Sequence, residues 1–133
     1  LAEAYHLTAS HFASTLFFNE NGEFKDVDLP IEAQLSPIRA ACAMKKDGKT
    51  IWILAGNRFH VEVETTRYDA GDGVVLTIDG TNMTVNLTHE TGLSLGHDVT
   101  SMAVTTNALG QQILLSVSNK GPVFARTITS EEH

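Results

Sequence analysis

Cysteine and long apolar runs are scarce in this chain of 133 residues. Cys42 is the single cysteine, so no disulfide can form within the chain. It lies in an apolar run, where a thiol stays protonated and unreactive and acts as a small buried hydrophobe. No run approaches the roughly 20 apolar residues that a membrane-spanning helix needs. The sequence therefore predicts neither a membrane span nor a fold held together by disulfides.

Positive charge is also in short supply. The chain has 9 Lys and Arg residues against 16 Asp and Glu residues, which gives a net charge of -7. The basic residues are scattered and form no stripe, and the overall negative charge repels a phosphate backbone. We therefore do not expect nucleic acid as a partner.

Signatures of catalysis are missing as well. No serine lies in a Gly-x-Ser-x-Gly elbow, and the chain has no glycine-rich phosphate loop and no paired-cysteine metal motif. Two neighbouring pairs, His89 with Glu90 and His97 with Asp98, have side chains suited to proton transfer. Sequence neighbours on an extended chain point apart, so neither pair is a ready-made dyad. We expect a protein that is not an enzyme and that needs no cofactor.

Short β-favouring runs separated by turn residues are what the chain has in plenty. Their regular spacing predicts antiparallel β-structure. Four glycine-bearing pairs favour tight reversals, because glycine adopts a positive φ without strain: Asn21-Gly22, Asp47-Gly48, Asp79-Gly80 and Lys120-Gly121. The expected strands cover residues 15–18, 24–28, 38–44, 51–55, 60–65, 74–78, 83–87, 102–105, 113–118 and 123–127. Only residues 1–12 have a pattern that suits a helix, and they lack a clear cap.

The length allows one modest core, so we expect a single domain over residues 1–133. The chain starts at Leu1 and not at Met, which favours a processed protein or a piece of a longer one. Residues 38–55 and 101–118 echo each other: each reads as strand, turn and apolar strand, followed by Asn57 or Asn119. This repeat fits successive propeller blades of about four strands each. Two unrelated hairpins are the alternative.

Three segments carry a resemblance to a known family: residues 29–38 (LPIEAQLSPI), 54–57 (LAGN) and 67–70 (RYDA). Their order resembles the C-terminal propeller segment of FG-GAP/VCBS-repeat proteins of the ASPIC/UnbV (cartilage-acidic-protein-like) type, and the similarity extends over residues 15–127. The resemblance implies an all-β antiparallel fold of two to three propeller-like blades, a fragment of a larger propeller. A small β-sandwich or barrel is the alternative. It also implies an exported protein, extracellular or periplasmic, with outer-surface association.

One element of the family pattern has degenerated. Family members carry a calcium loop of the form Asp-x-Asp-x-Asp-Gly-x-x-x-Asp, whereas the matching positions here are Ala43, Lys45, Asp47 and Ile51. One carboxylate cannot supply the roughly six to eight oxygen ligands of Ca²⁺, and the Lys45 ammonium repels the ion. We expect no calcium. Either Lys45 replaces the ion by reaching toward Asp47 or loop carbonyls, or the segment is an ordinary hairpin turn.

A histidine and two glutamates form a candidate metal site. His60, Glu62 and Glu64 alternate along the expected strand 60–65, so their side chains project from one face. Imidazole and carboxylate ligands suit Zn²⁺ or Mn²⁺. A polar stripe that simply faces solvent is the plainer interpretation.

A connector that contains glycine is the candidate binding site, with Asn57, Arg67, Tyr68, Asp69 and Asp72 as its residues. Tyr68 would be the aromatic anchor and Arg67 the polar one, since both types are enriched at binding hot spots. In the structural alternative, Arg67 pairs with Asp69 or Asp72 and orders the loop.

These observations favour a non-catalytic interaction module that binds a protein or a carbohydrate through loops at residues 57–72. A metal-dependent hydrolase or lyase that uses the His60, Glu62 and Glu64 face is one alternative. A purely structural propeller segment that contacts only its neighbouring blades is another. Two to three blades leave sheet faces and edges open, which predicts homo-oligomers or contact with the missing blades.

Overall fold

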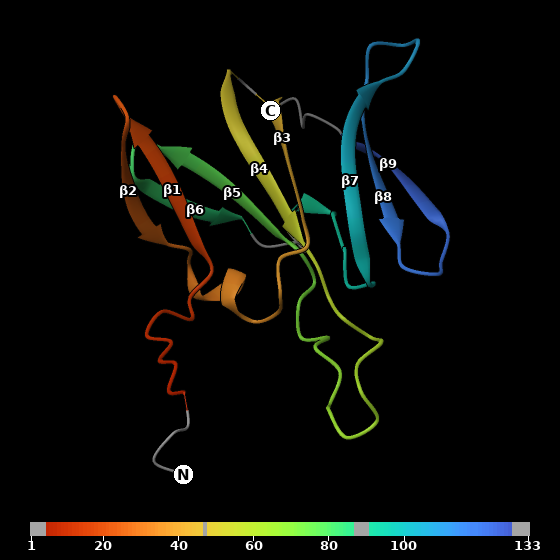
Figure 1. The fold of residues 1–133 in the computed structure, drawn as a ribbon. Helices are drawn as coiled ribbons and strands as arrows, with labels where there is room; N and C mark the ends of the chain where they lie inside the picture. Colours follow the sequence, from red (N-terminus) through yellow and green to blue (C-terminus); the bar gives the residue numbers. More distant parts are fainter. Residues whose placement is uncertain (1–4, 47, 87–90, 129–133) are drawn as a thin grey trace.

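The computed structural model describes residues 5–46, 48–86 and 91–128. Within these ranges the chain is all-β: nine strands form three antiparallel sheets, and one short 3₁₀ helix connects the first sheet to the second (Figure 1). Asp47 and Leu87, which the sequence placed in a turn and at a strand end, lie outside the described residues. No helix in the described part is long and apolar enough to cross a membrane.

The first sheet is a hairpin of β1 (Thr15–Glu20) and β2 (Glu23–Asp28). Its turn is Asn21-Gly22, as the sequence predicts, with φ values of 58° and 97°. Positive φ at both central residues matches the twist of the paired strands. The 3₁₀ helix η1 (Ile31–Gln34) follows and carries the chain from this hairpin to the second sheet.

The second sheet is a meander of four strands, β3 (Ala40–Lys46), β4 (Lys49–Ala55), β5 (Val74–Asp79) and β6 (Asn82–Asn86), each paired with the next along the chain. The third repeats this pattern with three strands, β7 (Val99–Thr106), β8 (Gln112–Ser118) and β9 (Val123–Ile128). None of the sheets closes on itself in the described ranges, and the arrangement is an open, sandwich-like stack.

The four-stranded sheet is the middle layer and is apolar on both faces. One face carries Ile51, Ile53 and Val75, which pack against Val99 and Leu114 of the three-stranded sheet. The opposite face carries the second core cluster, made of Ala33, Leu54, Leu76, Leu29, Ile38, Trp52, Val74, Ile78 and Val85. Because β4 is covered on both sides, its side chains form a continuous apolar run rather than an alternating one. The sequence prediction for this strand is confirmed.

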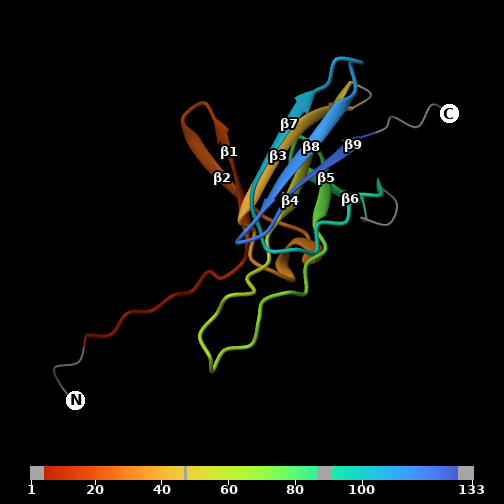
Figure 2. The same ribbon diagram turned by 90° about the vertical axis from the view of Figure 1, so that its right-hand side faces the viewer.

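The two echoing segments form matching hairpins, β3–β4 and β7–β8. Strands β3 and β7 pack together and run side by side in the same direction (Figures 1 and 2). Equivalent strands of the two sheets therefore meet at the interface between the layers.

Two expectations about regular structure are wrong. Residues 60–65 form no strand: the backbone N–H of Thr65 donates to the carbonyl of Glu62 in a turn, within a long connection between β4 and β5. An alternating pattern forms a strand only where a neighbouring strand offers a ladder, and none lies beside this segment in the described part. Residues 5–12 are not helical either, because their apolar side chains, such as Leu7 and Phe12, are exposed and pack on nothing.

Candidate functional site

The connection between β4 and β5, residues 56–73, projects beyond the end of the sheets (Figure 1). A two-way backbone bridge closes its base. The N–H of Arg58 donates to the carbonyl of Tyr68 over 2.8 Å, and the N–H of Tyr68 donates to the carbonyl of Arg58 over 3.1 Å. Residues 59–67 therefore form a protruding tip above a fixed neck, and we call residues 56–73 the β4–β5 loop.

Asn57 anchors the start of this loop from inside the molecule, with no exposed surface. Its Nδ2 donates to the carbonyls of Gly71 at 2.8 Å and Gly96 at 3.0 Å. Its Oδ1 accepts from Ser36 Oγ at 2.6 Å and from the N–H of Gly71 at 3.2 Å. One side chain thus ties together both ends of the loop, the segment before β3 and the segment before β7.

Asp98 is the second buried anchor and is 2% exposed. Its Oδ1 accepts from Nη1 of Arg39, and the same Nη1 donates to the carbonyl of Asn57 over 3.2 Å. Its Oδ2 accepts from the N–H of Phe59 at 3.3 Å and from Asn119 Nδ2 at 3.4 Å. Asp98 therefore links the loop to the strands on both sides of the layer interface.

The Asp98 carboxylate is charged despite its burial. Burial is the largest influence on its pKa and raises it. The hydrogen bonds from Phe59 and Asn119, the charge of Arg39 and the nearby His60 act in the opposite direction, and the net pKa lies below the usual value. His60 Nδ1 lies 3.6 Å from Asp98 Oδ2. The base of the loop is therefore a paired ionic cluster, in which the buried carboxylate has several donors.

The β4–β5 loop presents polar and aromatic groups to solvent. The Arg67 guanidinium lies 4.3 Å from the centre of the Phe59 ring, and its Nε lies 3.3 Å from Asp69 Oδ2. The expected pairing of Arg67 with Asp69 is confirmed, although both side chains are about half exposed and the pair contributes little to stability. Tyr68 is 48% exposed, and Val63 is fully exposed.

The candidate binding residues divide between the surface and the interior. Arg67, Tyr68 and Asp69 are exposed together on the loop. Asp72 is exposed near the neck, where its Oδ1 accepts from Ser94 Oγ at 2.7 Å and its carbonyl from the N–H of Leu95 at 3.0 Å. Asn57 reaches no surface, so its effect on a partner would be exerted through the position of the loop.

The candidate metal ligands lie in the same loop. Without the expected strand, His60, Glu62 and Glu64 lose the alternation that would have placed them on one face. His60 lies beside Asp98 instead. In the described ranges, no three side chains of His, Cys, Asp or Glu gather as metal ligands would.

At the degenerate calcium loop, strands β3 and β4 pair to the end, with Lys46 opposite Lys49. Lys45 Nζ donates to Thr50 Oγ1 over 2.5 Å, a contact across the hairpin. Ala43 lies on β3, and Ile51 is buried on β4. These contacts fit the ordinary hairpin turn, and the alternative contact with Asp47 falls outside the described residues.

His97, Asp98 and Cys42, which the sequence analysis weighed for reactivity, have no reactive partner among the described residues. His97 Nε2 lies 3.2 Å from Ser116 Oγ and its ring packs on Phe124, while Asp98 points to Arg39, so these neighbours point apart as expected. Burial and the charge of Arg126 lower the pKa of His97. Burial raises the pKa of Cys42, which keeps its thiol protonated. His89 and Glu90 lie outside the described residues.

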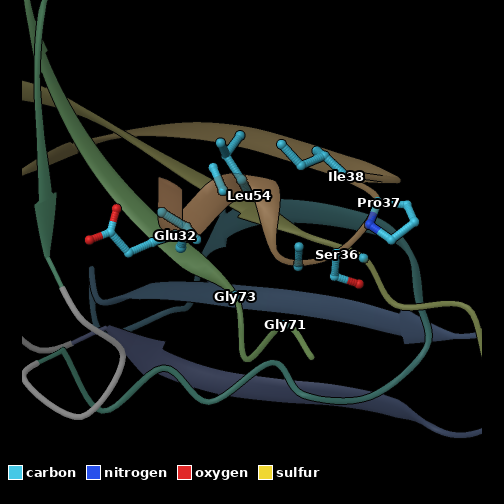
Figure 3. A pocket seen from close by; sticks show the side chains of 11 residues that line it. Glu32, Ser36, Pro37, Ile38, Leu54, Gly71 and Gly73 are labelled. Atoms are coloured by element: carbon cyan, nitrogen blue, oxygen red, sulfur yellow. The ribbon is translucent and has the colours of Figure 1, made fainter. Parts of the chain in front are cut away.

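A small cavity of about 20 Å³ lies beside the anchor, which is room for about one water molecule. Figure 3 shows Ser36, Pro37 and Ile38 on one side and the loop glycines Gly71 and Gly73 nearby. The chain segments approach closely here, and this cavity has no space for a larger ligand.

Sequence reasoning missed Asp98, Arg39, Ser36 and Phe59 as parts of this site. A polar residue directly before an apolar strand is the signal that could have found Arg39 and Asp98, whereas Ser36 and Phe59 lie in loops and carry no such signal. Comparisons of the chain with protein-family models, with curated proteins and with solved structures found no match.

Proposed function

We propose that this chain is a non-catalytic interaction module of an exported FG-GAP/VCBS-like propeller protein, and that the β4–β5 loop binds a protein or carbohydrate partner. The observation that carries the proposal is the construction of the loop. A buried base fixes its position, while Arg67, Tyr68 and Asp69 remain exposed beyond it. Loops held on a rigid scaffold are common sites of recognition.

The propeller part of the proposal rests on the sequence resemblance and on the order of the strands. A four-stranded meander followed by a second meander, with the first strands of each packed side by side, is what successive blades require. An exported location, extracellular or periplasmic and associated with the outer surface, comes from the resemblance alone.

The side chains at residues 67–69 of the β4–β5 loop suit reversible recognition. Tyr68 offers an amphipathic ring with a hydrogen-bonding hydroxyl. The Arg67 guanidinium lies over the Phe59 ring, and its Nε is paired with Asp69. Pre-ordering these side chains lowers the entropy lost on binding. The His60, Glu62 and Glu64 segment provides no comparable geometry for a hydrolase or lyase.

Photo-crosslinking from the loop tests this proposal. A benzoylphenylalanine at Tyr68 is expected to crosslink a protein in a cell-surface extract, whereas the same group at Asp26, on the β1–β2 hairpin, is not. A glycan array with neutral and acidic oligosaccharides tests the carbohydrate arm. Arg67→Ala and Tyr68→Ala should each weaken any binding found by about tenfold, the loss typical of a hot-spot side chain.

The outcomes separate the proposal from its alternatives. Equal crosslinking from positions 68 and 26, or binding that survives both alanine substitutions, contradicts recognition by the loop. If neither array nor crosslink gives a partner, the purely structural segment is favoured.

A further inference from the structure

A second hollow lies far from the loop tip, between the β1–β2 hairpin and the four-stranded sheet. Its volume is about 330 Å³. Ser14, Thr15, Leu16 and Leu29 form the hairpin side, and Ile38, Ala41, Trp52, Leu54, Leu76 and Ile78 form the sheet side. Figure 2 shows the hairpin diverging from the sheet toward its tip. We call this hollow the hairpin cavity.

The hairpin is held at one end and not along its length, and this keeps the cavity open. Gln34 forms a clamp there: its Oε1 accepts from the N–H of Ser14 at 2.7 Å, and its Nε2 donates to the carbonyls of Ser14 and Leu29, both at 3.0 Å. The N–H of Leu29 also donates to the carbonyl of Ser14 over 2.9 Å. These bonds hold the base of the hairpin to η1, and none of them joins the hairpin to a strand of the sheet.

The lining selects the chemistry of an occupant. None of the ten lining residues carries a charge. At the rim, Thr15 Oγ1 lies 2.7 Å from His11 Nε2 and 3.0 Å from Asp28 Oδ1, and the imidazole lies 3.5 Å from the same carboxylate oxygen. A carboxylate or phosphate among the apolar walls would lose hydration without gaining a cationic partner from the ten lining residues, and at the rim it would face Asp28 as well as His11. A neutral molecule avoids both costs.

The volume selects the size of an occupant. Dry apolar cavities of about 150 Å³ take up a benzene molecule. The hairpin cavity is open to solvent on one side, where Ala41 is exposed, so its volume of about 330 Å³ sets an upper limit that leaves room for two fused aromatic rings beside the half-buried Trp52 ring. Aromatic rings pack on one another in offset or edge-to-face geometry.

We infer that the hairpin cavity is a binding site for a neutral, bicyclic aromatic molecule, which packs on Trp52 between the β1–β2 hairpin and the β3–β6 sheet. This site goes beyond the proposed function of the β4–β5 loop and does not depend on it. Any single polar group of the ligand lies at the rim formed by Ser14 and Thr15.

Nuclear magnetic resonance tests this site directly, because Trp52 is the only tryptophan and gives one indole N–H signal. Titration with 2-naphthol should shift this signal to saturation, with a submillimolar Kd. The anionic analogue 2-naphthoate should bind at least about tenfold more weakly, because a buried unpaired charge is costly.

A pair of matched variants locates the site. Ala41→Phe puts a ring into the hairpin cavity and should weaken 2-naphthol binding by about tenfold or more, since it occupies the space of the ligand. Ala108→Phe adds the same ring at an exposed alanine in the turn between β7 and β8, and it should leave the Kd within about twofold of the parent. Thermal unfolding of both variants verifies that each is folded.

Three results would overturn the inference: no saturable shift up to the solubility of 2-naphthol, equal affinity for 2-naphthoate, or equal weakening by both variants. If Ala41→Phe does not fold, Ile78→Trp replaces it as the filling substitution and the same comparison applies. Loss of partner binding at the β4–β5 loop has no bearing on these readouts.

Discussion

At the scale of single residues, two buried polar side chains determine where the loop lies. Asn57 uses both its amide donors and its carbonyl oxygen, and Asp98 uses both carboxylate oxygens. A buried polar group costs free energy unless it is bonded, so each is tolerated only with its partners in place. The same requirement fixes the position of the loop, because the loop cannot move without leaving the Asn57 and Asp98 side chains unpaired.

The charge of Asp98 should be visible in the pH dependence of stability. Its pKa is lower in the folded chain than in the unfolded chain, so the folded state binds fewer protons. The resulting stabilisation is present above the unfolded pKa of about 4 and disappears as the pH falls through the lower folded pKa.

Asp98→Asn removes this charge and leaves the size of the side chain unchanged. We expect the variant to lose about 2 kcal/mol of unfolding free energy at pH 7, since hydrogen bonds to charged groups contribute on this order. Urea unfolding at pH 7 and pH 3 should show the difference between variant and parent shrinking in acid. An unchanged difference would mean that Asp98 is not charged in the folded chain.

Gly56 is a residue whose hydrogen side chain is required by packing. A Cβ at this position would lie 2.2 Å from the carbonyl oxygen of Pro37 and 2.6 Å from the backbone nitrogen of Arg39. Gly56→Ala should therefore lower the unfolding free energy by about 3 kcal/mol, the upper part of the range for overpacking.

Gly110→Ala is the matched control for Gly56→Ala. It adds the same methyl group at a φ of 77° with no atom within 4 Å, so it tests backbone strain alone, which costs about 1 kcal/mol. Equal losses in the two variants, measured by chemical denaturation, would refute the steric explanation.

At the scale of elements, the β4–β5 loop combines a rigid neck with a replaceable tip. Residues 62–65 are exposed and form a turn, in which the backbone N–H of Thr65 donates to the carbonyl of Glu62. Replacing residues 62–65 with Asn-Gly should keep the unfolding free energy within about 1 kcal/mol, because loop-closure entropy changes little with length.

The shortened loop also tests whether recognition depends on residues 67–69. Its thermal midpoint should match that of the parent, and a partner that binds through Arg67, Tyr68 and Asp69 should keep its affinity, because the replacement leaves these three residues in place. A large loss of stability would show that the tip, and not only the neck, is part of the folded core.

At the scale of the whole molecule, the layered stack ends in a sheet face that no part of the chain covers within residues 5–46, 48–86 and 91–128. The register of β7, β8 and β9 places Ala103, Leu115 and Ala125 in one row on this face, with Val117 and Val123 beside them. Val117 is 37% exposed and Val123 is 62% exposed. Apolar sheet faces of this kind favour association.

We therefore expect self-association that increases with protein concentration. Light scattering should show the weight-average mass rising, and Val117→Lys should reduce the effect by placing a charge in the contact. Thr81→Lys, in an exposed turn of another sheet, is the control. A monomer at all concentrations for the parent chain would contradict this expectation.

Much of the fold was predictable because strands and tight turns depend on local features. The Asn21-Gly22 turn and the doubly covered β4 strand followed from glycine conformation and from an uninterrupted apolar run. The pairing of Arg67 with Asp69 was also predictable, since the two residues are close in sequence. The predicted strand over residues 60–65 was wrong, because this alternating segment has no neighbouring strand to pair with in the described part of the chain.

The sequence by itself determined that this chain is all-β, that its strands reverse at glycine-bearing turns, and that Arg67, Tyr68 and Asp69 lie in a polar connector; the full length of the β4–β5 loop came from the structure. These properties depend on residue type and on near neighbours. Only the tertiary structure decided that Asn57 and Asp98 anchor the loop and that a neutral hollow lies beside Trp52. Both depend on residues that are distant in sequence, such as Arg39 with Asp98 and Leu16 with Leu76, which come together only when the layers stack.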